Sequence, residues 1–503
     1  MARRARRQQK PLIQAKPEWR QLRHPFQPHK MFSDDEINAI HDLSLKLLQD
    51  LGISVLLDEA RDIYAQGGAR VEDHMVFIGK DMVEAAIASA PSSFPLRCAN
   101  PERDLVMENG ALLFGPGSGC PNATDKINGR RPGSLADFEN AVRLTQSFDV
   151  LHTLGPCCEP QDIPVHLRHY SLTKTQLTLS DKFPFIYGRG RAQVNDCFDM
   201  IRLALDLDED DFLNNVWVET VVNTNSPRLI DRPMAQALID FARAGQLTVI
   251  TPFCLSGAMA PITVAGALVL QHAEALGALV LNQLAKPGAP AVIGGFGSNV
   301  DMKSGAPAFG TPEHIQMSIG TGQLARHVNL PWRGATGSAS NTTDMQAAGE
   351  THMSIWGNLM ANAGMVKHAA GWLEGGLTFG FEKFINDVEA LQTIATLCTK
   401  PDTSADALGW DALNQVAPGG HFFETDQTMA RYETAFYQPL MADLSNFGLW
   451  EKNGSKPSDE RATETWQQVL NDYVPPSGSD ERAARLEGFI AKRIEEGGAP
   501  ILD

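Results

Sequence analysis

The 503-residue chain lacks most of the patterns that identify a protein class directly. It has no run of about twenty uninterrupted apolar residues. The nearest run, at 262–284, is broken by polar residues, so we expect a core helix there and no membrane span. A P-loop, an HExxH motif and an ordered Ser-His-Asp set are also missing, which removes the reactions that those motifs indicate.

Cysteine is infrequent and irregularly spaced. The seven cysteines fit neither a disulfide framework nor the spacing of a structural zinc site. We therefore expect a protein of the reducing cytoplasm without a bound metal. Ligands contributed from distant parts of the chain could still form a zinc site, which spacing alone does not test.

Positive charge is in deficit, because 43 Lys and Arg residues stand against 60 Asp and Glu residues, for a net charge of −17. This balance argues against nucleic acid or an anionic membrane as the main partner. The exception is the extreme N-terminus, with Arg3, Arg4, Arg6, Arg7 and Lys10. We predict a basic, disordered arm over residues 1–30.

From about residue 110, apolar runs of strand length alternate with helical patterns. The strand-length runs are 112–114, 150–154, 184–187, 216–221, 247–251, 291–294, 331–334 and 365–368. The helical patterns are 134–145, 166–179, 193–205, 232–243, 263–284, 312–327 and 344–362. This alternation predicts a parallel sheet, and eight units favour a TIM-type (β/α)8 barrel over residues 106–376. Periodicity alone leaves an open, doubly wound sheet as the alternative.

Two further regions flank the predicted barrel. Residues 31–105 contain a helix with a capping box at Ser33 and Glu36, then short strands, so we expect an α/β N-terminal region packed against the barrel. Residues 377–503 contain helical stretches, including one at 427–443, which predict an α-helical C-terminal cap.

Aromatic residues make up only 7% of the chain, yet they recur where the predicted strands end. They are Tyr187, Phe253, Phe296, Trp332 and Trp372. Converging rings can hold a quaternary ammonium through cation–π attraction of about 0.5–2 kcal/mol per ring. The alternative for each ring is that it fills the barrel or packs under a loop.

Three ionisable side chains are candidates for catalysis. Glu219 lies in a predicted apolar strand, where a carboxylate is costly unless it is paired or functional, although it could instead point outward. His368 ends the last predicted strand, and a satisfied core histidine is its alternative. Asp344 precedes a helical pattern, and capping that helix is its alternative role.

Several motifs resemble the trimethylamine methyltransferase family. They are GAMAPITVAG at 257–266, GAPAFGTPE at 305–313, LPWR at 330–333, AAGWLEGG at 369–376 and GGHF at 419–422. The resemblance covers the chain from about residue 30 onward and implies a TIM-type barrel. It also implies transfer of a methyl group from a methylated amine to the cobalt of a separate corrinoid protein.

Archaeal members of that family carry pyrrolysine in the segment that corresponds here to about 337–349. This chain has only standard residues there, so it resembles the non-pyrrolysine members that act on glycine betaine. A quaternary ammonium needs no general acid, because loss of one methyl group leaves a neutral tertiary amine. We therefore expect a betaine-type substrate with a cationic head and a carboxylate tail.

Polar residues near the seventh strand are candidates for the carboxylate tail: Arg333, Asn341 and Gln346. Glu219 or Asp344 would balance the cationic head. Two alternatives stay open. One is demethylation of trimethylamine or another N-methylated compound, and the other is a non-catalytic protein that binds or senses quaternary amines.

We expect no tightly bound cofactor, because the sequence has no further Rossmann-like unit with a histidine-bearing loop. Cobalamin would therefore arrive on a partner protein that docks at the mouth of the barrel. The resemblance also implies a homo-oligomer.

Overall fold

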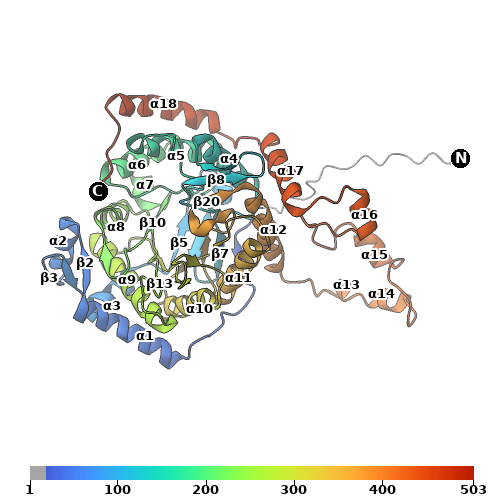
Figure 1. Ribbon diagram of the computed structural model, residues 1–503, viewed down its shortest axis with the longest axis horizontal. Helices are drawn as coiled ribbons and strands as arrows, with labels where there is room; N and C mark the ends of the chain where they lie inside the picture. The colour runs from blue at the N-terminus through green and yellow to red at the C-terminus, as the bar shows by residue number, and fades with distance from the viewer. Residues whose placement is uncertain (1–18, 503) are drawn as a thin grey trace.

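The computed structural model describes residues 19–502, and a parallel sheet lies at its centre (Figure 1). Six parallel strands follow the order β7-β18-β17-β14-β12-β10, and β1 pairs antiparallel with β7. Their bounds are β1 Leu22–Arg23, β7 Ala111–Phe114, β10 Glu219–Val222, β12 Leu247–Ile250, β14 Ala291–Gly294, β17 Trp332–Ala335 and β18 Met365–Lys367. Six of the eight predicted strands are therefore confirmed, and so is the α/β class.

The predicted strands at 150–154 and 184–187 are extended segments that form isolated bridges rather than regular strands. Thr153 bridges Phe183, and Phe185 bridges Glu219 of β10. The backbone N–H of His152 donates to the carbonyl oxygen of Phe114 in β7 (2.8 Å). The two segments thus lie between the outer parallel strands β7 and β10, but the prediction of eight regular strands is wrong here.

Side chains explain this irregularity, because they occupy backbone groups that a ladder would use. His152 Nδ1 accepts the N–H of Phe114 at 3.0 Å. Gln176 accepts the N–H of Phe185 at 3.0 Å and donates to its carbonyl oxygen at 2.8 Å. These groups are satisfied without a regular strand partner.

Helices alternate with the strands and lie around the sheet (Figure 1). Their bounds are α4 Leu135–Ser147, α5 Val165–Leu179, α6 Arg191–Leu205, α7 Glu209–Asn214, α8 Arg232–Ala244, α9 Val264–Ala285, α10 Pro312–His327 and α11 Met345–Ala361. By length and composition α9 could cross a membrane, but 83% of its apolar window is buried inside the protein. It is the core helix expected at 262–284.

The N-terminal region packs its three helices against α9. Its elements are α1 Asp34–Lys46, β2 Ile53–Val55, α2 Asp58–Gln66, β3 Arg70–Glu72, β4 Met75–Phe77, α3 Lys80–Ser89, β5 Ser93–Leu96, β6 Leu105–Glu108 and, from further along the chain, β11 Leu229–Ile230. The capping box at Ser33 and Glu36 is present. Residues 1–18 of the predicted arm lie outside the described residues. The prediction of disorder is wrong for residues 19–30, because Leu22 is buried where β1 pairs with β7.

The C-terminal region does not close over the strand ends as a cap. Its helices are α12 Phe381–Leu397, α13 Ala405–Leu408, α14 Trp410–Gln415, α15 Asp426–Arg431, α16 Phe447–Lys452, α17 Ser458–Asn471 and α18 Ser479–Glu495. α17 packs on α12 and α4, and α18 packs on α5 and α6. Residues 402–457, here called the arm, leave the body instead (Figure 1). The helix expected at 427–443 ends at Arg431, ahead of Pro439.

Two small sheets follow the carboxyl ends of the central strands. One has the order β19-β20-β8-β9 and the other β13-β15-β16. Their bounds are β8 Asn122–Asp125, β9 Gly129–Pro132, β13 Leu255–Ser256, β15 Ser298–Val300, β16 Pro307–Ala308, β19 Trp372–Leu373 and β20 Thr378–Gly380. They come from the loops after β7, β18, β12 and β14, so they build a rim around the strand ends.

Candidate active site

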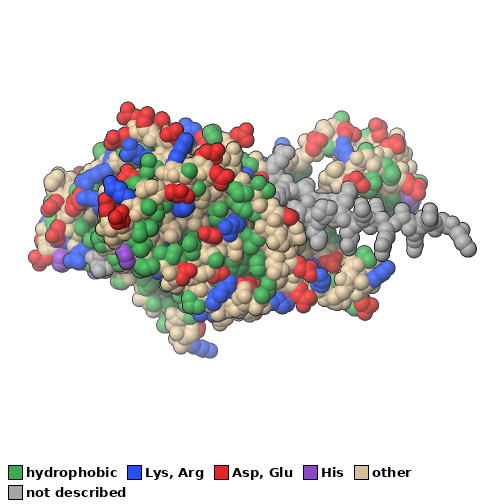
Figure 2. Space-filling model, turned by 90° about the horizontal axis from the view of Figure 1, so that it is seen from above, with side chains coloured by type: hydrophobic (Ala, Val, Ile, Leu, Met, Phe, Trp, Pro, Cys, Tyr) green, Lys and Arg blue, Asp and Glu red, His purple; other side chains and the backbone are tan. Residues whose placement is uncertain are grey.

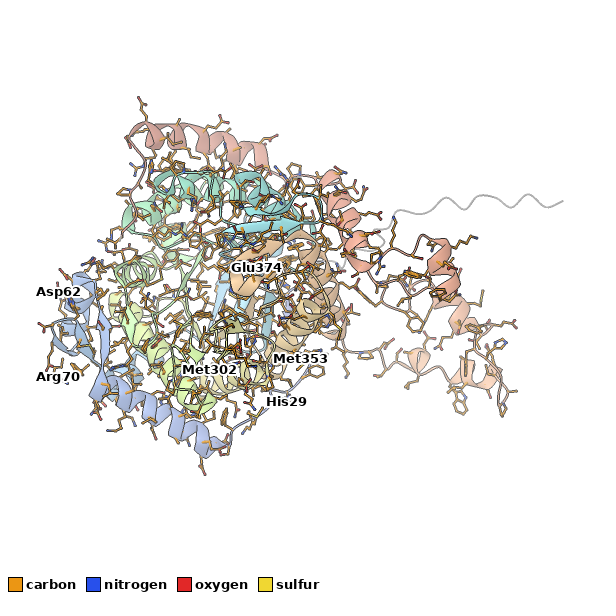
Figure 3. The ribbon with its side chains drawn as sticks, in the orientation of Figure 1. His29, Asp62, Arg70, Met302, Met353 and Glu374 are labelled. Carbon is orange, nitrogen blue, oxygen red and sulfur yellow. The ribbon has the colours of Figure 1, made fainter. Side chains whose placement is uncertain are left out.

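A cavity of about 430 Å³ lies at the carboxyl ends of the central strands. It extends from exposed Gly119 and Asn223 at its rim to buried Arg333 and Lys367 at its floor. Gly375 and Gly376 line another part of the rim, directly after Glu374, which lies near the centre of the view in Figure 3. The volume is in the range of roughly 300–1,000 Å³ that is typical of small-molecule sites.

Aromatic side chains form one wall of this cavity. Four of the five predicted rings line it: Tyr187, Phe253, Phe296 and Trp372. The centroid of the Phe296 ring lies 5.4 Å from that of Phe253 and 5.5 Å from that of Trp372. Sequence reasoning missed Phe185, which meets Tyr187 edge to face at 5.1 Å. The predicted convergence of rings is thus present in the structure.

An ion pair lies at the floor. Glu219 points inward and pairs with Lys367 Nζ, and both side chains are buried. Lys367 Nζ also donates to Thr153 Oγ1 at 2.9 Å. Burial raises the pKa of Glu219 and lowers the pKa of Lys367, and each partner opposes the shift of the other. The pair is electrically neutral overall, whichever residue holds the proton.

Sequence reasoning missed Lys367. The signal was available, because a lysine inside the apolar run 365–368 is as unusual as the glutamate inside 216–221. Two opposite charges in two predicted strands of one sheet indicate an internal ion pair.

Arg333 is the second cation of the floor and is only 2% exposed. Its Nη2 donates to His368 Nε2 at 2.9 Å, while Nε and Nη1 have no hydrogen-bond partner among residues 19–502. Burial lowers the pKa of Arg333 to about 9, against the raising influence of Glu219, so the guanidinium stays charged at neutral pH. Burial next to Arg333 holds the pKa of His368 well below its usual range, so this imidazole is neutral and accepts.

The floor therefore carries one uncompensated positive charge. The Glu219–Lys367 pair is neutral, His368 is neutral, and no carboxylate within residues 19–502 forms an ion pair with Arg333. A buried donor without an acceptor costs about 1–3 kcal/mol, and more when it is charged. A ligand carboxylate has two oxygens that match the guanidinium fork. The floor is built to receive an anionic group.

His368 also connects the floor to the aromatic wall. Its ring stacks on Trp372 at 4.9 Å between centroids and on Phe296 at 5.5 Å. Its backbone has a φ of 59°, in the left-handed region, which turns the chain sharply after β18. The placement of the guanidinium is thus fixed by a ring that itself belongs to the wall.

Trp332 does not line the cavity. Neighbouring residues in a strand point to opposite faces, so Trp332 points away from the cavity that Arg333 enters. Its indole N–H donates to the carbonyl oxygen of Asn362 at 3.0 Å, within the core. The prediction that Trp332 binds substrate is therefore corrected to a packing role.

Three residues predicted after the seventh strand also lie outside the cavity: Asn341, Asp344 and Gln346 are exposed. Asp344 caps α11 by accepting the N–H of Ala347 at 3.1 Å, which is the alternative stated for it. Gln346 donates to Glu350 at 2.8 Å. Asn341 and Asp344 precede α11 and Gln346 lies in its first turn. None of the three lines the cavity, so the structure does not support the substrate-binding and catalytic roles expected for them.

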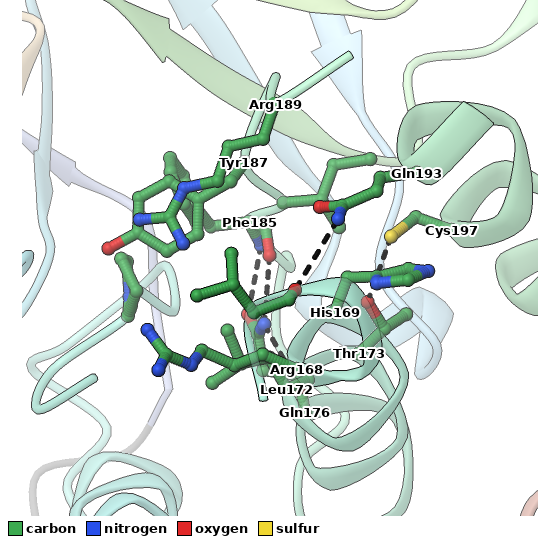
Figure 4. Close-up of a pocket in the computed structure, with 13 residues that line it drawn as sticks. Arg168, His169, Leu172, Thr173, Gln176, Phe185, Tyr187, Arg189, Gln193 and Cys197 are labelled. Atoms are coloured by element: carbon green, nitrogen blue, oxygen red, sulfur yellow. Dashed lines mark hydrogen bonds between the residues drawn. The ribbon is translucent and has the colours of Figure 1, made fainter. Parts of the chain in front are cut away.

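A second, much smaller cavity lies behind Tyr187 and Arg189 (Figure 4). Its volume of about 10 Å³ is close to the roughly 10–15 Å³ that one water molecule needs. Gln176, which fixes Phe185, lines it, and the Arg189 guanidinium lies 4.0 Å from the centroid of the Tyr187 ring. The residues around this small cavity support the wall of the main cavity, and the space itself is too small for a ligand.

Fold and cavity together define an α/β protein with a small-molecule site at the strand ends, with an aromatic wall and a cationic floor. The family described as trimethylamine methyltransferase (MTTB) matches residues 1–498. The chain belongs to this family.

Relatives of known name cover nearly all of the chain. A glycine betaine methyltransferase of Desulfitobacterium hafniense strain Y51 is 31% identical over 472 residues, covering 93% of this chain and 98% of the relative. A trimethylamine methyltransferase of D. hafniense strain DCB-2 is 30% identical over 473 residues, covering 93% and 94%. The monomethylamine methyltransferase of Methanosarcina barkeri is a structural neighbour with 10% identity, a TM-score of 0.47, and coverage of 92% and 93%.

The packing role of Trp332 predicts that Trp332→Ala destabilises the protein by about 3–5 kcal/mol, because it leaves a large cavity in the core. Urea denaturation measures the loss, and ligand titration of the folded protein should show an unchanged affinity. A variant with normal stability and weakened ligand binding would contradict the packing role and show that Trp332 contributes to the binding site.

The floor pair predicts that Lys367→Met destabilises by about 3–5 kcal/mol, because Glu219 is then buried without a partner. The double variant Lys367→Met/Glu219→Leu should recover most of this loss, since two apolar groups need no partner. A double-mutant cycle in urea checks both values. A double variant as unstable as the single one would contradict the pairing.

Proposed function

We propose that this protein moves a methyl group from a quaternary amine that carries a carboxylate, of the glycine betaine type, to the Co(I) of a separate corrinoid protein. The observation that carries the proposal is the buried Arg333 guanidinium with two unpaired donor atoms below a wall of aromatic rings. Membership of a methyltransferase family and the similarity to a glycine betaine methyltransferase support it.

The charges of the cavity set the orientation of such a substrate. An ammonium head would be repelled by the guanidinium at the floor, whereas the carboxylate is attracted to it. The carboxylate therefore lies on Arg333, with His368 holding the guanidinium in place. The head then lies higher, against Phe296 and Trp372, with an N-methyl group toward the rim.

The chain's own residues bind, orient and desolvate the substrate. When its carrier protein docks at the rim, the corrinoid supplies the Co(I) nucleophile that accepts the methyl group. A cavity of about 430 Å³ would hold a betaine but not a corrin ring, so the corrinoid carrier would have to dock at the rim. The electrons of the broken C–N bond stay on nitrogen, and the tertiary amine leaves without a proton.

The expected catalytic residues become positioning residues in this scheme. No step requires a general acid or base. Glu219 and His368 also each have a partner already: Glu219 neutralises Lys367, and His368 accepts a hydrogen bond from Arg333. Asp344 takes no part, since it caps α11 at the surface. The head is held by ring faces rather than by a carboxylate in contact with it.

We further propose that the segments at 150–154 and 184–187 complete a closed (β/α)8 barrel between β7 and β10. We also propose the cytoplasm as the compartment, with all seven cysteines free. The alternative substrate is trimethylamine or another N-methylated compound. Without a carboxylate, either would leave the Arg333 donors unpaired, so the floor favours a betaine.

The direct test mixes the purified protein with a reduced Co(I) corrinoid and a panel of methylated amines. We expect growth of the methylcobalamin absorbance with a betaine and little with trimethylamine or tetramethylammonium. Turnover of trimethylamine alone would overturn the substrate assignment. Tight binding of a betaine without any turnover would favour a binding or sensing protein.

The carboxylate contact predicts that Arg333→Met weakens betaine binding at least tenfold, because a hydrogen bond to a charged group contributes about 1.5–3 kcal/mol. Binding of tetramethylammonium, which has no carboxylate, should not weaken. Isothermal titration measures both ligands. Arg326→Met removes a half-buried arginine that does not line the cavity, and should change neither affinity. Equal losses for both ligands would contradict a role of Arg333 in holding the carboxylate.

The aromatic wall predicts that Trp372→Ala weakens betaine binding by a few kcal/mol at most. The matched ligand is 3,3-dimethylbutanoate, which replaces the trimethylammonium by an uncharged tert-butyl group of similar shape. The preference for betaine over this ligand should fall in Trp372→Ala and recover in Trp372→Phe. A preference that stays unchanged removes Trp372 from the cation site.

A further inference from the structure

The indole of Trp372, one of the rings of the aromatic wall, is held by contacts on several sides. It is 5% exposed and lines the cavity. His368 stacks on one face, and the Phe309 ring meets the indole edge to face at 5.1 Å between centroids. The indole N–H donates to the carbonyl oxygen of Ser118 at 3.3 Å. The arm stands apart from the body in Figures 1 and 2, so these surroundings come from the body alone.

Two glycines lie against opposite edges of this indole. A Cβ atom added to Gly376 would lie 2.5 Å from Cζ2 and 2.9 Å from Cε2 of Trp372. A Cβ atom added to Gly337 would lie 2.6 Å from Cζ3 and 3.1 Å from Cε3. Carbon atoms attract at about 3.5–4.0 Å, so only glycine fits at either position while the indole keeps its place. Gly376 ends residues 374–376, here called the strap, and Gly337 begins residues 337–340, here called the loop.

The strap and the loop are bonded to each other. The backbone N–H of Glu374 donates to the carbonyl oxygen of Ser340, and that of Gly375 donates to the carbonyl oxygen of Ser338, both at 2.9 Å. All three residues of the strap have a positive φ, of 53°, 63° and 103° along the chain, which makes the turn tight. The two segments therefore form one unit, here called the indole slot, with a glycine on each side.

A carboxylate anchors each side of the indole slot. Arg130 of β9 donates three hydrogen bonds of 2.9, 3.0 and 3.0 Å to the carboxylate of Glu374 in the strap. Glu350 of α11 accepts from the hydroxyl of Ser338 and from the backbone N–H of Ala339 in the loop, both at 2.8 Å. Hydrogen bonds to a charged group are stronger than neutral ones. The sides of the slot are thus held by contacts other than those with the indole.

We propose that Gly337 and Gly376 are specificity-determining residues, because the indole slot fixes the Trp372 ring against the cationic head of the substrate. The inference rests on the proposed function, in which the head lies against Phe296 and Trp372. Cation–π attraction requires the cation over a ring face, within about 6 Å of the centroid. A ring that shifts in its site loses this contact for part of the time. The two glycines act through Trp372, so they are positioning residues.

The slot affects the recognition of charge more than the recognition of shape. Glycine betaine and 3,3-dimethylbutanoate have heads of similar shape, and both carry the carboxylate that Arg333 would hold. Only the first has a cationic head that a ring face attracts. The ratio of their affinities therefore reports the contact between the head and the rings, whereas a general loss of fit weakens both ligands alike.

Isothermal titration of both ligands gives the first test. Gly376→Ala should lower the affinity ratio of betaine to its neutral analogue by roughly threefold or more, because the displaced indole loses cation–π attraction. The matched control is Gly305→Ala, which also adds a Cβ at positive φ (75°) but has nothing within 4 Å of it and does not line the cavity. The control should keep the ratio.

A second substitution should rescue the first. A phenyl ring is shorter than an indole and leaves room for the added methyl group, so Gly376→Ala/Trp372→Phe should show the ratio of Trp372→Phe alone. Arg130→Met serves if the alanine variant does not fold, because it releases the strap without filling the slot, and it should also lower the ratio. An unchanged ratio in the folded variants overturns the inference. A wild-type protein that does not prefer betaine contradicts the proposed function instead.

Fluorine NMR without any ligand tests the slot independently of the proposed function. The protein is labelled with 6-fluorotryptophan, whose fluorine lies on Cη2, between the two contacted edges of the indole. The resonance that disappears in Trp372→Phe belongs to this ring. Gly376→Ala and Gly337→Ala should each shift that resonance, while Gly305→Ala should leave it in place. A resonance that stays in place in both slot variants overturns the inference even if betaine is the substrate.

Discussion

The buried charge of Arg333 is the constraint on which the rest of the site depends. An arginine at 2% exposure needs compensation, and in this protein the surroundings supply only part of it. Glu219 is occupied by Lys367, and His368 offers a single lone pair. The Arg333 donors can all be paired only with an external acceptor, which under the proposed function is the carboxylate of the substrate.

Under the proposed function, the floor would hold one end of the substrate and the aromatic wall the other. Arg333 and Lys367 lie on β17 and β18, which are buried and paired with a strand on both sides. Glu219 lies on β10, which pairs with β12 on one side and with the segment at 184–186 on the other, so the floor is rigid. Three of the rings, Phe253, Phe296 and Trp372, follow strand ends. His368 joins the two parts, because it accepts from Arg333 and stacks on Trp372.

The sequence predicted the parts of this design that depend on local pattern. Strand–helix alternation located six strands and the helices between them, and four of five rings were found because they follow strand ends. Trp332 was placed wrongly because a period of two residues does not say which face is inward. The predicted roles of Asn341 and Gln346 fail for a similar reason, since both residues follow a strand end but lie on the surface.

Long-range geometry was harder to predict from the sequence. The apolar runs around Glu219 and Lys367 signal that each charge needs a partner, but the two residues are 148 positions apart, so their direct contact is seen only in the structure. The two irregular segments were predicted as strands because their composition is apolar, while the polar side chains of His152 and Gln176 satisfy backbone groups there. Hydrogen bonds between a side chain and a distant backbone group depend on three-dimensional proximity, which sequence periodicity does not encode.

Gln176 also shows how the outer helices shape the cavity. It lies on α5, away from the main cavity, yet it holds both backbone groups of Phe185, and Tyr187 follows two residues later. The curvature of the aromatic wall is thus set from the helical layer behind it. A substitution at Gln176 would therefore change the shape of the cavity while leaving every side chain that lines it unchanged.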